Sequence, residues 1–504
     1  MKQSIPLSLS LSLNSSTNLP TPNSLLHYVQ IITSSHIASF RHIIRKMGFR
    51  SSLAFVGRLV NELVSFVVFS ALDLLDVFLC LVYKLADYAK EAEWKPCYCS
   101  SSSTNDMIAS SGNILVSDGN NGRSKIVCLC SSSKLQLEDI SDTLYCRSSI
   151  VSDISRATVE ELRRKKVKRS ATTTVTINST IVQMLKGKIG GQQSHPVPRW
   201  SDCDCKTCTS WSSASRNSLY VHVQSPDDGS IPKEDVLFIH GFISSSAFWT
   251  ETVFPNFSES ARSKYRLLAV DLLGFSLYTL REHVDMIERV IEQHDVKSFH
   301  IVAHSLGSIL ALALAVKYPD SIKSLTLLAP PYFPVPKGEQ GTQYVLRKVA
   351  PRRVWPLMAF GASLACWYEH ISRTICLLIC KNHRVWEFLF KFITRNRIKT
   401  FLMEGFFCHT HNAAWHTLHN IICGSADKID GYLDTVRDRL DCNVTVIHGR
   451  KDEVLPVECS IAVKSRIPRA NLKIIDNKDH ITVIVGNQKS FARELEEIWN
   501  NTKQ

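Results

Sequence analysis

An α/β fold, built on a mostly parallel central sheet with helices on both faces and a helical cap insertion, is predicted by three observations. Short apolar runs alternate with helical stretches over residues 216–504. The run 236–239 is apolar throughout, as expected of a parallel strand that helices cover on both faces. The connections are short, and consecutive strand, helix and strand segments joined in this way require a parallel sheet. Residues 216–504 are therefore the predicted main domain.

Composition sets broad limits on the rest of the chain. The 504 residues, 44% of them hydrophobic, suit one large domain with extensions, or two domains. Much of the net charge of +13 lies in the run 163–169, which has no aromatic residues beside it to stack on bases. We therefore predict no nucleic-acid partner. The sixteen cysteines favour an oxidising compartment only weakly.

The first 96 residues divide into two segments. Residues 1–46 are rich in Ser and Leu with little pattern, and Met47 is a second possible start, so we expect a poorly ordered leader or an upstream extension. Residues 47–96 contain the apolar run 63–83, which as a helix is long enough to cross about 30 Å of hydrocarbon. This second segment is the predicted membrane anchor or signal anchor.

Charges around the run 63–83 bear on its topology. Basic residues are in excess on its N-terminal side, which predicts that everything after it is translocated. Asp73 and Asp76 oppose full insertion, and they lie on one helical face. There are two alternatives: an interfacial helix, and a soluble helix packed on the catalytic domain. We expect a membrane-associated or secreted protein that contacts a membrane surface.

Residues 97–215 are polar, Ser-rich and irregular, and we predict a long linker there. Cys203, Cys205 and Cys208 form a Cys-x-Cys-x-x-Cys motif in it. A structural zinc site needs a fourth ligand, whereas Cys97 and Cys99 offer partners for disulfides, so both interpretations stay open.

The residues around Ser305 predict a nucleophile. A buried strand over 298–302 runs through His304-Ser305-Leu306-Gly307 into a helix of small and apolar residues over 309–316. This is the nucleophile elbow, in which only small residues fit two positions before and after the serine. Ala303 takes the first of these positions in place of the commoner glycine, and the steric demand is still met. The amide of Leu306 is the predicted first oxyanion donor.

A second oxyanion donor is predicted after the strand 235–239, which ends in His240-Gly241-Phe242. This architecture places that donor in such a turn, and we assign it to the amide of Phe242. His240 is expected to be buried and to shape the turn. Asp271, at the end of the strand 265–271, is expected to order a loop rather than to take part in catalysis.

The last two strands supply the remaining catalytic candidates. The strand 443–447 leads to Asp452, and the strand 471–475 leads to His480, which gives the order Ser, Asp, His of the α/β-hydrolase fold. His480 would be the general base and Asp452 would hold its tautomer. Glu453 is the rival carboxylate. His304 and His448 are expected to be packing residues.

Between residue 333 and about residue 429 the strand pattern stops, and a helical segment rich in large apolar residues replaces it. An insertion at this point is where α/β-hydrolases carry a cap, and an apolar cap suits an acyl chain. A Cys and His group there lacks a carboxylate to complete a metal site, so cap packing is favoured. That group consists of Cys408, His409, His411, His416 and His419. We predict no metal and no cofactor.

Four motifs carry a resemblance to a known family: Trp94-Lys95-Pro96-Cys97-Tyr98-Cys99, residues 201–208, Phe238-Ile239-His240-Gly241-Phe242, and residues 302–307. With them, the chain from about residue 47 to the C-terminus resembles the plant BODYGUARD family of α/β-hydrolases, described as probable lysophospholipases. The resemblance implies a role in epidermal cells, at the plasma membrane or in the cell wall. There it implies that the protein helps to build the cutin-containing cuticle and limits water loss.

The expected activity is that of a serine esterase that acts on a lipid ester through an acyl-Ser305 intermediate. Transfer of the acyl group to water would give a lysophospholipase or acyl-ester hydrolase, and transfer to a hydroxylated fatty acid would give a transacylase. The alternative is a ligand receptor on a hydrolase scaffold. The sequence gives no basis for inferring a protein partner or an oligomeric state.

Overall fold

A computed structural model gives the structure of the chain, which divides into two units, Met1–Val64 and Ser65–Gln504. The described residues are 49–91, 107–109, 113–117, 124–128, 141–144, 200–203, 219–226, 232–272, 279–393, 395, 400–407 and 411–502. Several predictions fall outside them: the leader over 1–46, the basic run 163–169, and the roles of Cys97, Cys99, Cys205, Cys208, Cys408 and His409.

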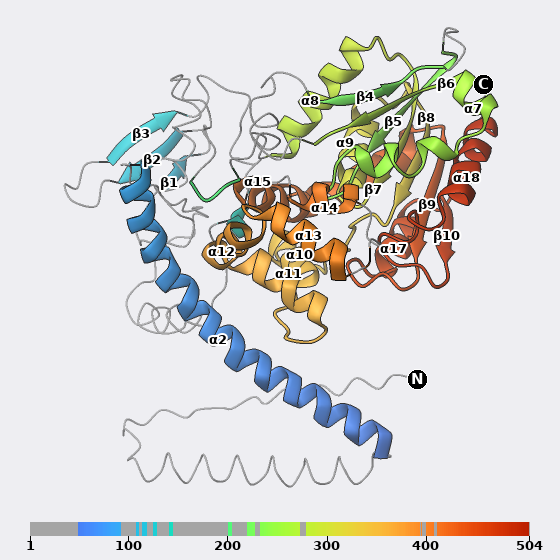
Figure 1. Cartoon of the computed structure of the whole chain (residues 1–504). Coiled ribbons are helices and arrows are strands. Elements are labelled where there is room, and N and C mark those ends of the chain that lie inside the picture. Colours follow the sequence, from blue (N-terminus) through green and yellow to red (C-terminus); the bar gives the residue numbers. More distant parts are fainter. Residues whose placement is uncertain are drawn as a thin grey trace, which may run out of the picture. The chain divides into compact units, whose positions relative to one another are not determined.

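The second unit is built on a seven-stranded sheet in the order β10-β9-β8-β7-β5-β6-β4. All neighbouring strands are parallel except β4, which pairs antiparallel with β6 (Figure 1). The strands are β4 Val221–Gln224, β5 Glu234–Ile239, β6 Tyr265–Val270, β7 Phe299–His304, β8 Ile322–Leu328, β9 Asn443–Gly449 and β10 Asn471–Ile475. The predicted α/β fold with a mostly parallel sheet is confirmed.

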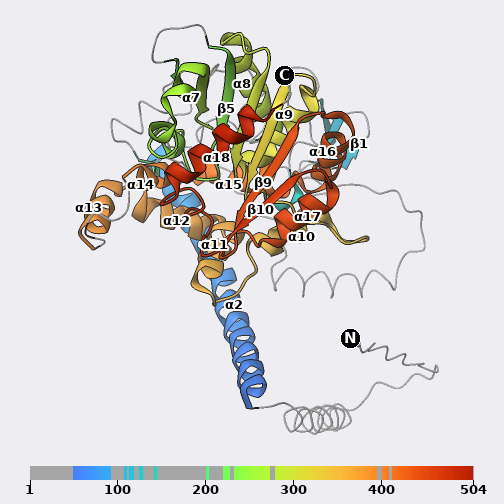
Figure 2. The ribbon, with the colours of Figure 1, turned by 90° about the vertical axis from the view of Figure 1, so that its right-hand side faces the viewer.

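Helices cover both faces of the sheet. One face carries α8 (Leu280–Gln293), α9 (Gly307–Lys317), α16 (Ala426–Arg439) and α17 (Glu458–Arg466). The other carries α6 (Ala247–Thr250), η3 (Phe254–Asn256), α7 (Glu259–Lys264) and α18 (Gln488–Asn500). Figure 2 shows α18 on one side of β9, with α16 and α17 on the other.

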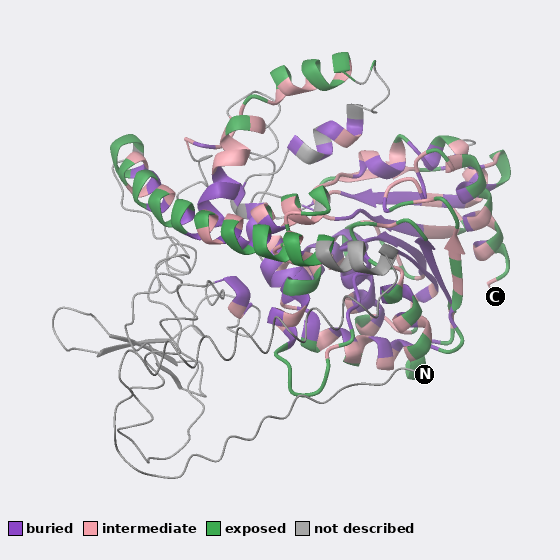
Figure 3. Ribbon diagram, turned by 90° about the horizontal axis from the view of Figure 1, so that it is seen from below, coloured by how far each residue is buried: buried purple, intermediate pink, exposed green. Residues whose placement is uncertain are grey.

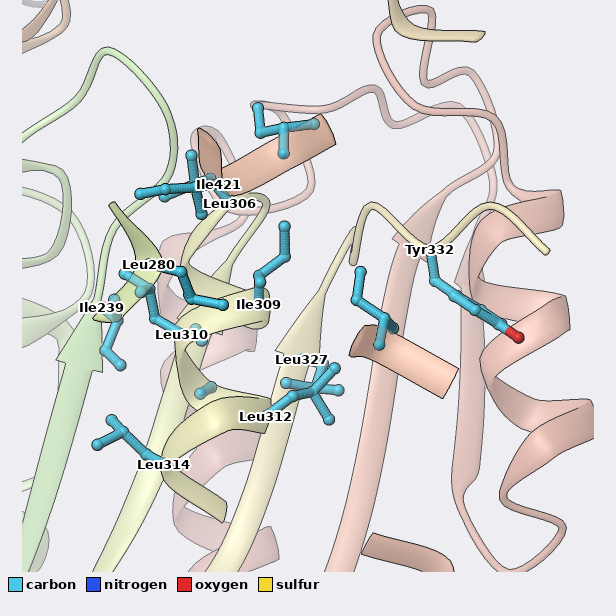
Figure 4. Close-up of a cluster of buried hydrophobic side chains, with 14 of the residues drawn as sticks. Ile239, Leu280, Leu306, Ile309, Leu310, Leu312, Leu314, Leu327, Tyr332 and Ile421 are labelled. Atoms are coloured by element: carbon cyan, nitrogen blue, oxygen red, sulfur yellow. The ribbon is translucent and has the colours of Figure 1, made fainter. Parts of the chain in front are cut away.

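Each face of the sheet has its own hydrophobic core, because successive strand residues point to opposite faces. In β5, Leu237 and Ile239 belong to the core under α9, whereas Val236 and Phe238 belong to the core under α18. The central strands are buried (Figure 3). Figure 4 shows the first core, in which Ile309, Leu310 and Leu312 of α9 lie close to the sheet. This packing fixes the start of α9, where Ser305 is presented.

All regular secondary structure in the described residues of the cap is helical. It comprises α10 Gly341–Val349, α11 Leu357–Trp367, α12 Glu369–Ile379, α13 His383–Ile393, α14 Thr400–Phe407, α15 His411–His416 and a π-helix over Thr417–Cys423. In α14, a Cβ on Gly405 would lie 3.3 Å from the backbone of Ser244, so this helix lies directly over the loop after β5. The predicted cap insertion is therefore part of the fold.

Part of the predicted linker contains regular structure. Strands β1 (Met107–Ala109), β2 (Asn113–Ser117) and β3 (Ser124–Cys128) form an antiparallel sheet. The turn η2 (Asp142–Leu144) is held on the π-helix, because the Ser141 amide donates to Asn420 Oδ1 at 3.0 Å and Thr143 hydrogen-bonds His419. Over most of 97–215 the linker stays a prediction.

The apolar run near the N-terminus forms the long helix α2 (Phe49–Glu91). Within the described part of the chain, its residues Gly57–Lys90 make the one helix that is long and apolar enough, by length and composition, to cross a membrane.

Candidate active site

Ser305 sits in a tight turn between β7 and α9. Its φ angle of +52° lies in the left-handed region, which costs a non-glycine residue about 1–3 kcal/mol and marks a conformation imposed by its surroundings. The Ser305 amide donates to Leu328 O at 2.8 Å. A Cβ on Gly307 would lie 2.6 Å from His240 O and 2.7 Å from Ile239 O, so only glycine lets α9 start this close to β5. The predicted elbow geometry is present.

The two predicted oxyanion donors lie beside Ser305. A Cβ on Gly241 would come within 3.1 Å of Ser305 Cβ, so the turn that carries Phe242 passes next to the serine. The backbone N–H groups of Phe242 and Leu306 donate to no acceptor among the described residues. Two unused donors at this point suit a developing oxyanion, and the start of α9 adds a favourable dipole.

His240 shapes the turn that holds Phe242. Its Nδ1–H donates to Gly241 O at 2.7 Å, and its Nε2 accepts from the Leu272 amide at 2.9 Å. Both ring nitrogens are thus used by the backbone, in agreement with the expected role. Asp271 accepts a hydrogen bond from the Ser246 amide, which orders the same loop.

Asp452 and His480 meet past the carboxyl ends of β9 and β10. His480 Nδ1 donates to Asp452 Oδ2 at 2.7 Å. Asp452 Oδ1 accepts from the amides of Val454 and Leu455 at 2.9 and 2.8 Å, which fixes the carboxylate. Burial alone would raise the pKa of Asp452, but hydrogen bonds from His448 and His480 outweigh it, so its pKa lies well below the usual range. The carboxylate is therefore ionised and can orient the imidazole.

His448 takes part in this arrangement in a way that the sequence analysis missed. Its side chain is fully buried, and its Nε2 lies 3.2 Å from Asp452 Oδ2 and 3.0 Å from Leu455 O. Its Nδ1 accepts from Ser460 Oγ at 2.6 Å. His448 is thus a second donor to the carboxylate. The available signal was the four-residue spacing between His448, near the end of β9, and Asp452 in the loop that follows.

His480 is held over the elbow by the residue before the serine. His304 Nε2 donates to His480 O at 3.0 Å, and the two rings lie 4.7 Å apart between centroids. The ring of Phe248 also stacks on His304, with 5.0 Å between the ring centroids. In the described structure His480 is hydrogen-bonded to Asp452 and not to the Ser305 hydroxyl, a contact that often closes only when substrate binds.

Gly449 allows the loops of Asp452 and His480 to approach each other. A Cβ there would lie 2.5 Å from Lys478 O and 2.7 Å from Asp479 O. Both clashing atoms belong to the backbone, so a side chain at this position would force the residues before His480 to move.

We expect Gly449→Ala to lower kcat/KM for an ester by about 10²-fold, because displacement of a catalytic group by about 1 Å has this effect. Activity assays and thermal unfolding check it. Gly431→Ala, in α16 with no atom within 4 Å of the added Cβ, is the matched control and should retain full activity. Equal activities of the two variants would contradict the assignment.

Two buried histidines make folding sensitive to acid. Burial lowers the pKa of His240 to about 4, and burial together with the charge of His480 lowers that of His304 to about 3. The unfolded side chain has a pKa of about 6.5. Between these values the unfolded chain binds more protons, so stability is present above about pH 6.5 and is lost as pH falls toward 4.

From pH 6.5 to pH 5 we expect each of these two histidines to remove on the order of 1–2 kcal/mol from the free energy of unfolding. Denaturant unfolding across this range measures the slope. His240→Gln should flatten this slope, because it removes one of the two buried histidines. An unchanged slope in His240→Gln would refute the assignment.

Two histidines of the Cys and His group in the cap form hydrogen bonds to hydroxyl groups. His411 Nδ1 hydrogen-bonds Ser372 Oγ, and His419 Nδ1 hydrogen-bonds Thr143 Oγ1. Cys203 of the cysteine motif lies 3.4 Å from His383 Nδ1 at the start of α13. Within the described ranges, no three His, Cys, Asp or Glu residues are arranged to hold a metal ion.

Comparison with known proteins gives concordant matches. The family model of the alpha/beta hydrolase fold matches residues 236–354. The chain is 58% identical to the "Probable lysophospholipase BODYGUARD 3" of Arabidopsis thaliana, over 90% of this chain and 99% of that protein. It is 54% identical to the "Probable lysophospholipase BODYGUARD 1" of the same plant, over 90% and 98% of the two chains. It is 52% identical to BODYGUARD 2, over 89% and 99%.

Proposed function

The chain belongs to the BODYGUARD family of α/β-hydrolases, and from this premise we propose that it is a serine hydrolase of lipid esters. One observation carries the proposal. The His480–Asp452 pair, joined at 2.7 Å, lies beside an elbow in which Ser305 is held at a φ of +52°. These are the parts that acyl transfer through a serine nucleophile requires.

In the proposed mechanism, Ser305 Oγ attacks the ester carbonyl while His480 Nε2 accepts the hydroxyl proton. The amides of Phe242 and Leu306 stabilise the oxyanion, and one such donor is worth about 2.7–4 kcal/mol of transition-state stabilisation. His480 then gives the proton to the leaving alcohol. Water attacks the acyl-Ser305 in a second step, and Asp452 stabilises the imidazolium in both steps.

A lysophospholipid is the proposed substrate class, because the relatives with 52–58% identity carry the name probable lysophospholipase. The apolar composition of the cap also suits an acyl substrate: no residue of α13 is buried, and Phe388 and Phe392 are exposed. Water is the proposed acceptor. A hydroxylated fatty acid in its place would make the protein a transacylase, which would yield an ester instead of a free fatty acid.

Incubation of the purified chain with lysophosphatidylcholine and with a monoacylglycerol, followed by mass spectrometry of the lipids, tests the function. Free fatty acid should form with the unaltered chain and not with Ser305→Ala. Tight lipid binding by both proteins without turnover would instead indicate the ligand receptor.

We propose that the catalytic domain is extracellular, at the plasma membrane or in the cell wall of plant epidermal cells. There it would act in cuticle formation. The family resemblance supports this part. A glycan on Asn178 would show translocation. Asn256 is a poor acceptor, because its amide donates to Thr252 O at 2.6 Å and Phe257 in the same sequon is buried.

A further inference from the structure

From Ser65 on, helix α2 turns its polar side inward. The buried positions recur every three or four residues, and three of them are carboxylates. The buried positions are Ser65, Phe69, Asp73, Asp76, Cys80, Tyr83 and Asp87. A helix on the surface of a soluble domain has the opposite arrangement, with its apolar stripe inside. The inversion therefore indicates that the outer side of α2 does not face water.

All three carboxylates are held by the cap. Asp73 pairs with Arg352 at 2.9 Å. Asp76 Oδ1 accepts from the amides of His370 and Ile371 at 2.9 and 3.0 Å, at the start of α12.

The last carboxylate, Asp87, forms a bidentate pair with Arg373 at 2.7 and 2.9 Å. Both side chains are almost fully buried. Removing one partner of such a pair leaves an uncompensated charge, so the docking of α2 on the cap is specific.

The docked stretch is as long as a membrane span. Contacts with the cap run from Ser65, whose hydroxyl accepts from the Val354 amide at 3.0 Å, to Asp87. At 1.5 Å per residue this is about 33 Å, against about 30 Å for the hydrocarbon core. If α2 crossed the bilayer, it would either leave Arg352 and Arg373 unpaired or take the cap into lipid with it.

The exposed positions of this stretch are all apolar. Every exposed position of α2 from residue 66 to residue 83 carries an apolar side chain (Figure 3). The large ones are Phe66, Val67, Leu74, Leu75, Val77, Phe78, Leu81 and Val82. The hydroxyl of Ser70 donates back to Phe66 O at 2.7 Å, which satisfies it without water.

The cap extends this outer side. Trp355, 71% exposed, follows Val354, the residue bonded to Ser65. Leu378, 59% exposed, lies one turn after Thr374, which hydrogen-bonds Tyr83 at 2.8 Å. We call the exposed residues of α2 between positions 66 and 82, together with Trp355 and Leu378, the α2 surface. Two exposed cations, Lys90 and Arg353, lie next to it in the chain.

We propose that the α2 surface rests on a lipid bilayer, so that α2 lies in the plane of the membrane with the cap above it and does not cross. A protein partner fits less well, because the core of a protein interface is only about 65% apolar. A tryptophan and cations at the edge suit the headgroup region, where anionic lipids attract the cations.

Flotation of the full chain with vesicles of phosphatidylcholine and phosphatidylserine tests the proposal. Phe78→Lys with Leu81→Lys, at two positions about 60% exposed, should lower the vesicle-bound fraction by about tenfold or more without lowering the melting temperature. The matched pair Tyr220→Lys and Ile461→Lys adds the same charge elsewhere and should float normally. Ser305→Ala should float normally too, since binding does not depend on catalysis.

Three further results decide between orientations. Protease sites inserted after residues 46 and 96 should both be cut from the same side of co-translationally loaded vesicles. Cutting at only one of them would mean that α2 spans the membrane and would overturn the proposal. Asp73→Leu should lower the melting temperature and leave flotation unchanged, because Asp73 faces Arg352. If the Phe78 and Leu81 variant floats normally but loses a dimer that light scattering detects in the unaltered chain, a second copy of the chain covers the α2 surface. That result would overturn the proposal.

Discussion

Ser305→Ala abolishes ester hydrolysis in this account, with kcat expected to fall by about 10⁶-fold. The loss is this large because the serine, the imidazole and the carboxylate act as a unit, so the other two groups contribute little without the nucleophile. The oxyanion donors of Phe242 and Leu306 would remain and support only residual turnover. Steady-state rates on a short-chain ester measure the effect.

Substrate binding should survive the Ser305→Ala change, because alanine keeps the buried Cβ and removes only the hydroxyl. Ser308→Ala, in the first turn of α9, is a matched control: its hydroxyl makes one 3.4 Å contact with Ala303 O and should matter little. Turnover by Ser305→Ala comparable to that of Ser308→Ala would show that another residue is the nucleophile.

Asp452→Asn is expected to lower kcat by about 10⁴-fold. The neutral amide no longer stabilises the imidazolium, and it can present an N–H to His480, which favours the wrong tautomer. In this protein the change also weakens one of the two acceptors of His448 Nε2, which lies 3.2 Å from Asp452 Oδ2 and 3.0 Å from Leu455 O. Ester hydrolysis by the purified variant, with thermal unfolding to separate loss of fold from loss of rate, measures it.

Glu453→Gln is the control for Asp452→Asn, because it neutralises the neighbouring carboxylate on the exposed side of the same loop. It should retain nearly full activity. A large loss in Glu453→Gln with little loss in Asp452→Asn would transfer the orienting role to Glu453.

The sheet and the position of the candidate site could be predicted because each buried parallel strand is visible as a short apolar run in the sequence. Apolar runs such as 236–239 mark buried strands, and the carboxyl ends of such strands lie at one edge of the sheet. Residues just past those ends, Ser305, Asp452 and His480, could therefore be assigned to one site from their order alone. Their roles stay predictions until the variants are measured.

Contacts between distant segments were not predictable. Hydropathy identified the apolar run 63–83 but gave no sign that Asp73 would pair with Arg352, which lies 279 residues further along the chain. Hydropathy also did not indicate that Ser141, in the predicted linker, would donate a backbone hydrogen bond to Asn420. His448 was assigned to packing, because only the folded loop shows it beside Asp452.

Covalent labelling identifies the nucleophilic serine and its dependence on His480. A fluorophosphonate reacts only with an activated serine, and peptide mass spectrometry locates the adduct. We expect one adduct, on Ser305, that disappears in His480→Ala as well as in Ser305→Ala. Labelling of a different residue, or undiminished labelling of Ser305 without His480, would contradict it.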